Sequence, residues 1–114
     1  MRFSVIMPAH NAGRWIGEAL ESVAAQTVAA DEVIVIADSC TDDTIERARG
    51  FVELPIKVIA CECRNAAATR NLGIREARGA FVAMLDADDV WLPNHLASAL
   101  ALLADSDDVA YMSG

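Results

Sequence analysis

The chain is poor in basic residues: 9 lysines and arginines stand against 17 acidic residues, for a formal net charge of −8. Only one of the nine is a lysine, Lys57. A surface with this charge balance repels a polyphosphate backbone, so nucleic-acid binding is not expected. The same shortage of cations argues against a basic helix lying on a membrane surface.

Long apolar runs are missing as well, since none approaches the ~20 residues that a membrane-spanning helix needs. The first dozen residues do not form a signal peptide, because their short apolar run stops at Pro8 and is followed by His10 and Asn11. With neither an export signal nor a transmembrane segment in this chain, we expect a cytoplasmic protein.

Cysteine is scarce, and the three residues of this type are Cys40, Cys61 and Cys63. An odd number of cysteines makes no disulfide framework. Cys61 and Cys63 are separated by one residue instead of two, and no second pair accompanies them, so a zinc site is not indicated. We therefore expect three free thiols.

Apolar residues, in contrast, make up 54% of the 114 residues, which suffices for one compact domain over residues 1–114. Short apolar runs rich in β-branched residues alternate with helical patterns. Strands are predicted over residues 3–7, 33–36, 56–60 and 81–85, with a fifth from about 109. Helices are predicted over residues 15–26, 41–50 and 66–77, with a fourth from 93. This alternation predicts an α/β fold of three layers, α/β/α, around a mainly parallel, Rossmann-like sheet.

Individual residues have expected structural roles in these elements. Thr41 is expected to cap the second helix through its hydroxyl, and Pro93 to open the fourth. Trp15 and Trp91 are interpreted as packing residues, the first under the first helix and the second beside the acidic loop. His95 is expected at the surface.

Polar residues gather where the predicted strands end. Residues 8–11 follow the first strand, residues 38–42 the second, Arg64 and Asn65 the third, and residues 86–89 the fourth. Open α/β sheets bind ligands outside the carboxyl ends of their strands. We therefore expect these residues to share one binding site.

Asp86, Asp88 and Asp89 are the most informative of these polar residues. Three carboxylates so close together repel one another unless a cation or protons neutralise them. Oxygen ligands at a strand end suit Mg²⁺ or Mn²⁺, although a solvated acidic turn that caps the next helix is the alternative. The sequence has neither a glycine-rich dinucleotide fingerprint nor a P-loop, so a bound diphosphate would need a metal to balance its charge.

Four segments, residues 4–11, 21–44, 65–73 and 77–89, together resemble the N-terminal, nucleotide-binding half of family 2 glycosyltransferases. The last of them contains the Asp-x-Asp motif of that family at Asp86 and Asp88. The resemblance implies a glycosyltransferase that binds a nucleotide-diphosphate sugar, with a UDP-sugar favoured, through Mn²⁺ or Mg²⁺, and that transfers the sugar with inversion to an unknown acceptor.

The resemblance also implies roles for single residues. Nine would contact the nucleotide sugar: Pro8, Ala9, His10, Asn11, Asp38, Asn65, Arg70, Asp86 and Ala87. Asp38 would accept a hydrogen bond from the base, and Arg70 would reach the base or the phosphates. Asp86 would face the ribose or the sugar. Asp88 would hold the metal that bridges the diphosphate.

In the family, the acceptor-binding half and its catalytic base lie beyond the position that corresponds to Gly114. We therefore expect a donor-binding fragment, truncated before the acceptor-binding half and inactive alone, for which no catalytic residue can be named. A non-catalytic nucleotide-binding or regulatory module is the alternative. A metal-dependent nucleotidyltransferase is disfavoured, because the expected glycine- and lysine-bearing loop is missing after the first strand. An unfinished sheet edge predicts self-association, most simply a homodimer.

Overall fold

The computed structural model of the chain describes residues 3–103 and 111–113. Strands and helices alternate along the sequence, as the apolar pattern predicts. They are β1 (Phe3–Ala9), α1 (Ile16–Ala24), β2 (Glu32–Asp38), α2 (Thr44–Gly50), β3 (Ile56–Cys61), α3 (Ala66–Glu76), β4 (Phe81–Met84), α4 (His95–Leu103) and β5 (Tyr111–Ser113). None of the helices in the described ranges is long and apolar enough to cross a membrane.

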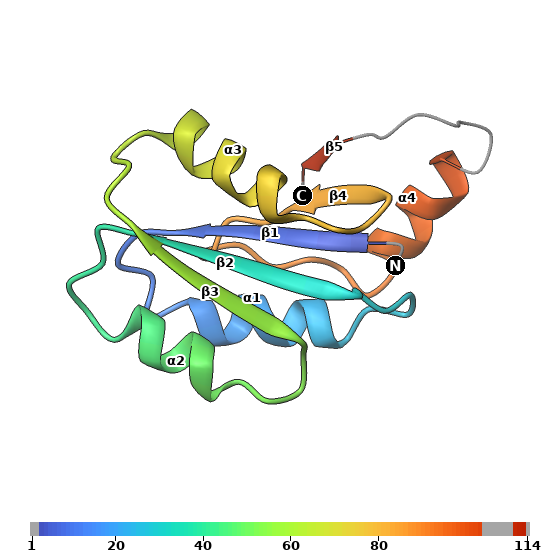
Figure 1. The fold of residues 1–114 in the computed structure, drawn as a ribbon. Helices are drawn as coiled ribbons and strands as arrows, with labels where there is room; N and C mark the ends of the chain where they lie inside the picture. Colours follow the sequence, from blue (N-terminus) through green and yellow to red (C-terminus); the bar gives the residue numbers. More distant parts are fainter. Residues whose placement is uncertain (1–2, 104–110, 114) are drawn as a thin grey trace.

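The five strands form one sheet in the order β3-β2-β1-β4-β5, and every neighbouring pair is parallel (Figure 1). The chain moves outward from β1 through β2 to β3 and then crosses back to place β4 on the other side of β1. This reversal leaves a crevice at the carboxyl ends of the central strands, where α/β sheets of this kind bind ligands. The predicted Rossmann-like parallel sheet is confirmed.

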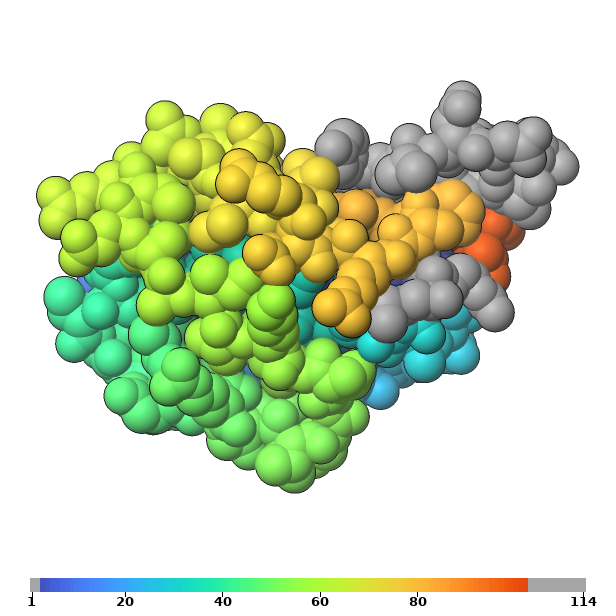
Figure 2. All heavy atoms as spheres, in the orientation of Figure 1, coloured from blue at the N-terminus to red at the C-terminus, as the bar shows by residue number. Residues whose placement is uncertain are grey.

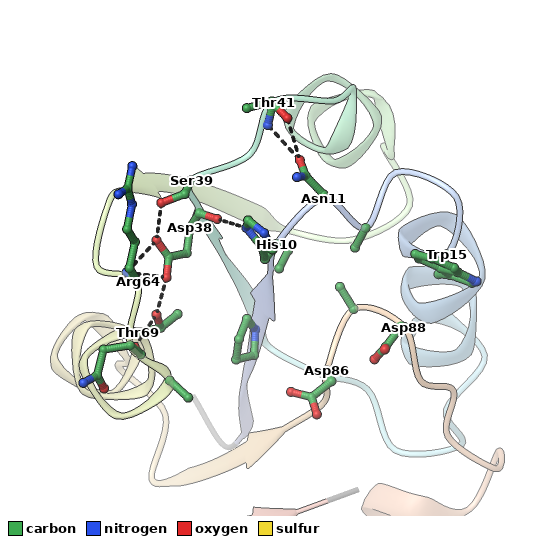
Figure 3. Close-up of a pocket in the computed structure, with 16 residues that line it drawn as sticks. His10, Asn11, Trp15, Asp38, Ser39, Thr41, Arg64, Thr69, Asp86 and Asp88 are labelled. Atoms are coloured by element: carbon green, nitrogen blue, oxygen red, sulfur yellow. Dashed lines mark hydrogen bonds between the residues drawn. The ribbon is translucent and has the colours of Figure 1, made fainter.

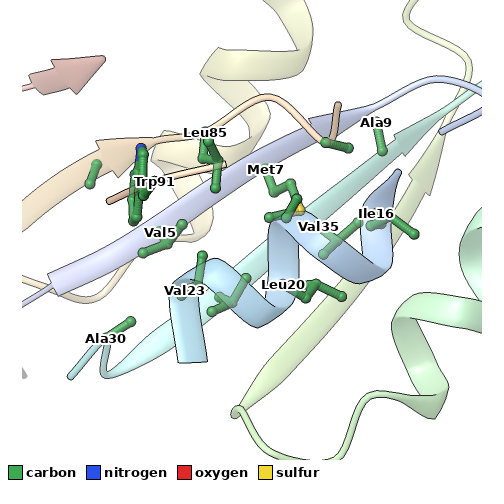
Figure 4. Close-up of a cluster of buried hydrophobic side chains, with 14 of the residues drawn as sticks. Val5, Met7, Ala9, Ile16, Leu20, Val23, Ala30, Val35, Leu85 and Trp91 are labelled. Atoms are coloured by element: carbon green, nitrogen blue, oxygen red, sulfur yellow. The ribbon is translucent and has the colours of Figure 1, made fainter. Parts of the chain in front are cut away.

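The larger part of the core lies between the sheet and α1, and alternation along the strands builds it (Figure 4). Val5 and Met7 of β1 and Val35 of β2 point to this face, where they meet Ile16 and Leu20 of α1. Leu96 and Ala99 of α4 join the same cluster. Because successive side chains of a strand point to opposite faces, the residues between them are left for the other side of the sheet.

Those intervening residues make a second, smaller cluster of Ile6, Ile34, Ile36 and Val82. Leu72 of α3 packs against it, so α3 covers the face opposite α1, as the three-layer prediction requires. Figure 2 shows the atoms of α3 (yellow) and β3 (yellow-green) as one continuous surface on this side. Continuous β-branched runs such as residues 33–36 are needed here, because β2 is covered on both faces.

Several element boundaries differ from the prediction. β1 does not stop at Met7 but continues through Pro8, whose carbonyl oxygen accepts a hydrogen bond from the Ala87 N–H at 3.2 Å. α4 begins at His95, two residues after the predicted opening at Pro93. β5 begins at Tyr111, and residues 109 and 110 of the predicted fifth strand lie outside the described ones.

The predicted cap of the second helix was wrong. Thr41 lies three residues before α2, and both its N–H and its hydroxyl donate to the Asn11 side-chain oxygen instead. Thr44 opens the helix, with its hydroxyl donating to the Asp42 carboxylate. The Asp42 carboxylate also accepts from the Gly13 N–H at 3.0 Å. The turn after β2 is therefore tied to the turn after β1.

The two tryptophans differ in environment. Trp91 is 5% exposed and stacks on the half-buried His95 with ring centroids 4.5 Å apart, which confirms its packing role. Trp15 was expected under the first helix, but its side chain is 44% exposed. The reason is the helical spacing: Ile16, Leu20 and Val23 fill the buried face of α1, and Trp15, just before the helix, does not belong to that face.

One buried polar side chain, Gln26, joins α1 to the segment before α4. It is 8% exposed, and its Nε2 donates to the Leu92 carbonyl at 2.7 Å and to the Ser22 carbonyl at 3.0 Å. Its Oε1 accepts from the Leu96 N–H at 2.9 Å. These bonds fix the chain that leaves the Asp86–Asp89 turn.

Candidate functional site

A cavity of about 800 Å³ opens at the carboxyl ends of β1, β2, β3 and β4 (Figure 3). Most of the polar residues that the sequence predicts after the strands line this cavity, whereas Cys40, Asp42 and Asp89 do not. The lining residues are Pro8, Ala9, His10, Asn11, Ala12, Trp15, Asp38, Ser39, Thr41, Arg64, Asn65, Ala66, Thr69, Asp86, Ala87 and Asp88. A volume of this size is within the range of small-molecule sites.

The turn after β1 contributes His10 and Asn11, and both are held by the turn after β2. The His10 Nδ1 lies 2.8 Å from the Asp38 backbone carbonyl oxygen. Because a carbonyl oxygen only accepts, Nδ1 carries the hydrogen, and Nε2 of the neutral ring is left as an acceptor. The Asn11 Oδ1 accepts from the Thr41 N–H at 2.7 Å. This wall of the cavity is therefore preorganised by contacts within the chain.

Several hydrogen bonds of the opposite wall of the cavity are made to Asp38, at the end of β2. Its carboxylate accepts from the Arg64 N–H at 2.9 Å and 3.1 Å, from the Thr69 hydroxyl at 3.2 Å and from the Ser39 hydroxyl at 3.0 Å. The bond from the Arg64 N–H is the largest influence that lowers the pKa of Asp38, with smaller contributions from the two hydroxyls. Asp38 is thus a fixed anion that joins the ends of β2 and β3 to α3.

Three residues of this lining have left-handed backbone conformations: Asn11 at φ 46°, Ser39 at φ 54° and Arg64 at φ 51°. Each follows directly after a strand or lies within three residues of its end. Residues other than glycine adopt this region at an energetic cost, and asparagine tolerates it best. The turns that shape the cavity are therefore held by the hydrogen bonds of the site, and not by local backbone preference.

Asn65 and Arg70, both on or beside α3, are placed differently. Asn65 caps the helix, its Oδ1 accepting from the N–H groups of Ala67 at 2.8 Å and Ala68 at 3.1 Å, so only its amide NH₂ remains for a ligand. Arg70 is exposed and is not among the described lining residues. Its positive charge partly offsets the rise in the pKa of Asp86 that burial and the charges of Asp88 and Asp89 cause.

The acidic turn after β4 is fixed by an extension of the sheet ladder. Beyond Met84, the Leu85 N–H donates to the Ile6 carbonyl at 3.0 Å and the Ala87 N–H to the Pro8 carbonyl at 3.2 Å. Side chains alternate in direction along this extended segment, so Asp86 and Asp88 point the same way. Both of them line the cavity.

Asp86, Asp88 and Asp89 present carboxylate oxygens that all lie within 4.8 Å of one another. Partial burial raises the pKa of Asp86, and the negative charges of Asp88 and Asp89 raise it further. Two donors on opposite sides of a Mg²⁺ ion are about 4.2 Å apart, so small side-chain movements would let these oxygens share one ion. The donor set, hard oxygens alone, fits Mg²⁺ or Mn²⁺.

Of the residues predicted to contact the nucleotide sugar, all except Arg70 line the cavity, and so does Asp88, the predicted metal ligand. Ser39, Thr41 and Arg64 were expected only as part of the polar strand ends, and Ala12, Trp15, Ala66 and Thr69 were not expected in the site. Thr69 and Ser39 look like ordinary helix and turn residues in the sequence, and only the position of Asp38 reveals that they bond to it. Trp15 and Thr41 were assigned to packing and capping. Arg64 was recognised only as a polar residue at a strand end.

The cysteines lie beside the site and not in it, and all three are free thiols, as predicted. The Cys63 thiol donates to the Cys61 sulfur at 2.9 Å. Burial and this contact raise the pKa of Cys61 to about 11.

Comparison with known proteins identifies proteins that are similar to this chain in sequence and in fold. Residues 4–114 match the model of the family described as Glycosyl transferase family 2. An Escherichia coli protein named UDP-Glc:alpha-D-GlcNAc-diphosphoundecaprenol beta-1,3-glucosyltransferase WfgD is 34% identical over 97% of this chain. The chain spans 44% of the length of that relative.

The solved structures that share the fold include the following two. Residues 1–349 of Staphylococcus aureus TarS, in complex with UDP-GlcNAc, superpose with a TM-score of 0.77 at 34% identity, covering 92% of this chain and 32% of that one. A mannosyltransferase of Pyrobaculum calidifontis, in complex with GDP-Man and Mn²⁺, gives a TM-score of 0.84 at 31% identity, covering 92% of this chain and 33% of that one. With the family match extending over nearly all of its residues, the chain belongs to glycosyl transferase family 2.

Proposed function

We propose that this chain binds a nucleotide-diphosphate sugar through Mn²⁺ or Mg²⁺, as the donor-binding part of a glycosyltransferase that acts with inversion. The observation that supports this function is that one cavity is lined by Asp86 and Asp88 and also by Asp38. One end offers fixed hydrogen-bonding groups for a nucleoside, and the other offers carboxylates for the cation that a diphosphate needs. The neighbour structures with UDP-GlcNAc and with GDP-Man and Mn²⁺ support this reading.

In this proposal the nucleoside lies between the turns after β1 and β2. His10 presents its ring and the acceptor Nε2, and Asp38 presents a carboxylate that is ionised above its lowered pKa. Pro8, Ala9 and Asn11 shape the floor and one wall. The Asp38 carboxylate already accepts from the Arg64 N–H and from the Thr69 and Ser39 hydroxyls, so a donor group of the base would share one of its oxygens with these contacts.

The diphosphate lies over the acidic turn in this arrangement. Asp88 would hold the cation, and Asp86 would face the ribose or the sugar. A bound divalent cation neutralises the charge that develops on a departing nucleoside diphosphate. The exposed Arg70 adds a second positive charge near Asp86, on the side of α3.

Transfer with inversion requires the acceptor hydroxyl to attack the sugar from the face opposite the diphosphate. A general base must therefore stand away from Asp88. We place this base, and the binding of the acceptor, in the part of the relatives' length that this chain does not span. The anomeric configuration of the product, read by NMR, tests inversion. A cytoplasmic location and a homodimer stay predictions.

The test of donor binding is a thermal-shift titration with UDP and GDP, each with and without Mn²⁺ or Mg²⁺. A ligand at a hundredfold excess over its Kd stabilises the folded state by about 2.7 kcal/mol. We expect a rise in Tm for at least one nucleotide that depends on the cation. If neither nucleotide shifts Tm with either cation, the proposed function is wrong.

Asp88→Asn is the variant that localises the cation. It should abolish the cation-dependent shift and leave the fold intact, because one carboxylate ligand is replaced by a neutral amide. Glu53→Gln, an exposed acid that does not line the cavity, is the matched control and should behave as the wild type. An Asp88→Asn protein with an unchanged cation titration would place the cation elsewhere.

A further inference from the structure

We propose that Trp15 forms a stacking surface for the sugar ring of the donor at the far end of the cavity. The inference rests on the proposed function, because it takes the nucleotide to lie at the other end. It assigns a sugar-contacting role to a residue that sequence reasoning placed in the core.

The first observation is the unusual environment of this side chain. A single exposed apolar residue such as Val52, 87% exposed, is common on protein surfaces and indicates nothing by itself. Trp15 is 44% exposed and, unlike Val52, it lines the cavity. An indole ring open to solvent inside a binding site is a large apolar surface that a ligand can cover.

The second observation is that the backbone of Trp15 is fixed. Its N–H donates to the Ala12 carbonyl at 2.9 Å, and its own carbonyl accepts from the Ala19 N–H at 3.1 Å. The Ala12 N–H in turn donates to the buried Thr44 hydroxyl at 2.9 Å. The start of α1 is thereby tied to the start of α2. A ring on such a support can meet a ligand without a large loss of conformational freedom.

The third observation is the order of groups along the cavity. Figure 3 shows Asp38, Arg64 and Thr69 on one side and Trp15 on the opposite side, with Asp86 and Asp88 between them. A nucleotide sugar has the same order, namely nucleoside, diphosphate and sugar. With the nucleoside at Asp38 and the diphosphate at the acids, the remaining part of the ligand extends toward Trp15.

The chemistry of the ring agrees with this placement. A pyranose presents C–H groups on its faces and hydroxyls around its edge, so its faces pack on aromatic rings while the hydroxyls stay hydrated. The Arg14 guanidinium lies over the Trp15 ring, 5.4 Å from its centroid, and this cation–π contact occupies one face of the indole. The sugar would therefore stack on the other face.

The experiment is isothermal titration of the 114-residue chain, in Mn²⁺, with UDP, UDP-glucose, UDP-N-acetylglucosamine, GDP and GDP-mannose. The quantity compared is the Kd of each sugar nucleotide divided by the Kd of its parent diphosphate. Trp15→Ala should raise this ratio about tenfold for the preferred donor, equivalent to about 1.4 kcal/mol, and leave the Kd of the parent diphosphate unchanged. Trp15→Phe should raise it less.

Leu92→Ala is the matched control, since Leu92 is 75% exposed and does not line the cavity, and its ratio should equal that of the wild type. An unchanged ratio in Trp15→Ala would overturn the sugar role. Equal weakening of the diphosphate and its sugar would overturn it too, because Trp15 would then act on the diphosphate. If the wild type binds none of the five ligands, the proposed function itself fails, and this inference fails with it.

Discussion

Replacing Gln26 by alanine tests how much the hydrogen bonds of this buried amide stabilise the segment that follows the Asp86–Asp89 turn. The variant removes the donor to the Leu92 and Ser22 carbonyls and the acceptor of the Leu96 N–H. Gln26 lies two residues beyond the end of α1, so no change in helix propensity is added to these losses. The effect on stability therefore reports the hydrogen bonds together with the lost packing of this buried side chain.

The magnitude follows from the groups left behind. The Leu96 N–H is buried, and such a group costs about 1–3 kcal/mol when it loses its partner. The Leu92 carbonyl is only partly buried and contributes less. We expect Gln26→Ala to lower the free energy of unfolding by about 2–4 kcal/mol, a large part of the roughly 5–15 kcal/mol typical of a domain.

The assay is urea unfolding followed by tryptophan fluorescence, because Trp91 is buried next to this segment. Glu21→Ala, on the exposed side of α1, is the matched control and should change the free energy by less than about 0.5 kcal/mol. A Gln26→Ala protein within 0.5 kcal/mol of the wild type, on the same general expectation for surface changes, would refute the reasoning.

Gln26→Glu separates the donor from the acceptor. A carboxylate can still accept from the Leu96 N–H, but it faces the Leu92 and Ser22 carbonyls without a hydrogen to donate. Burial and these carbonyls should raise the pKa of the new carboxyl in the folded state. The stabilisation is then complete below the ordinary glutamate pKa of about 4.3 and is lost as pH rises through the folded-state value. Gln26→Glu should therefore approach the wild type in stability at low pH.

Three further variants test the site and its supports. Asp86→Asn should raise Tm at pH 7 without metal, because the raised pKa of Asp86 reflects a charge that burial and its neighbours disfavour. Asp38→Asn should reduce the loss of Tm between pH 5 and 2, since a lowered folded-state pKa gives stability that disappears as pH falls. Gly73→Ala would place a Cβ 2.5 Å from Ile6 and should destabilise by about 1–2 kcal/mol, whereas Gly17→Ala, with open space, should not; equal urea midpoints would contradict this.

The fold could be predicted from the sequence because its strands are short apolar runs that the sheet buries on both faces. Val33 and Ile34 point to opposite faces and are both fully buried, so no polar residue interrupts the pattern. Boundaries were less predictable. Pro8 lacks an N–H and suggests the end of a strand, yet its carbonyl oxygen still serves the ladder to β4.

The sequence predicted those site residues whose place follows from their own position after a strand. It missed residues that belong to the site only through a hydrogen bond to another residue. An acid directly after a buried strand, such as Asp86, must lie at the carboxyl ends of the strands, whatever surrounds it. Thr69, in contrast, becomes part of the site only because its helix packs across from Asp38. Trp15 was interpreted as a packing residue under the first helix, and its exposure depends on which face of α1 the neighbouring residues fill.

The left-handed turns at Ser39 and Arg64 set a limit on how this protein can be made more robust. Glycine would remove a conformational cost of roughly 1 kcal/mol at each position, although the greater freedom of unfolded glycine offsets part of that gain. A laboratory selection for heat resistance alone would therefore favour Ser39→Gly and Arg64→Gly. Each would delete a side chain from the cavity wall. Directed evolution of this chain should consequently screen for nucleotide retention in every round, since both residues line the proposed nucleotide site.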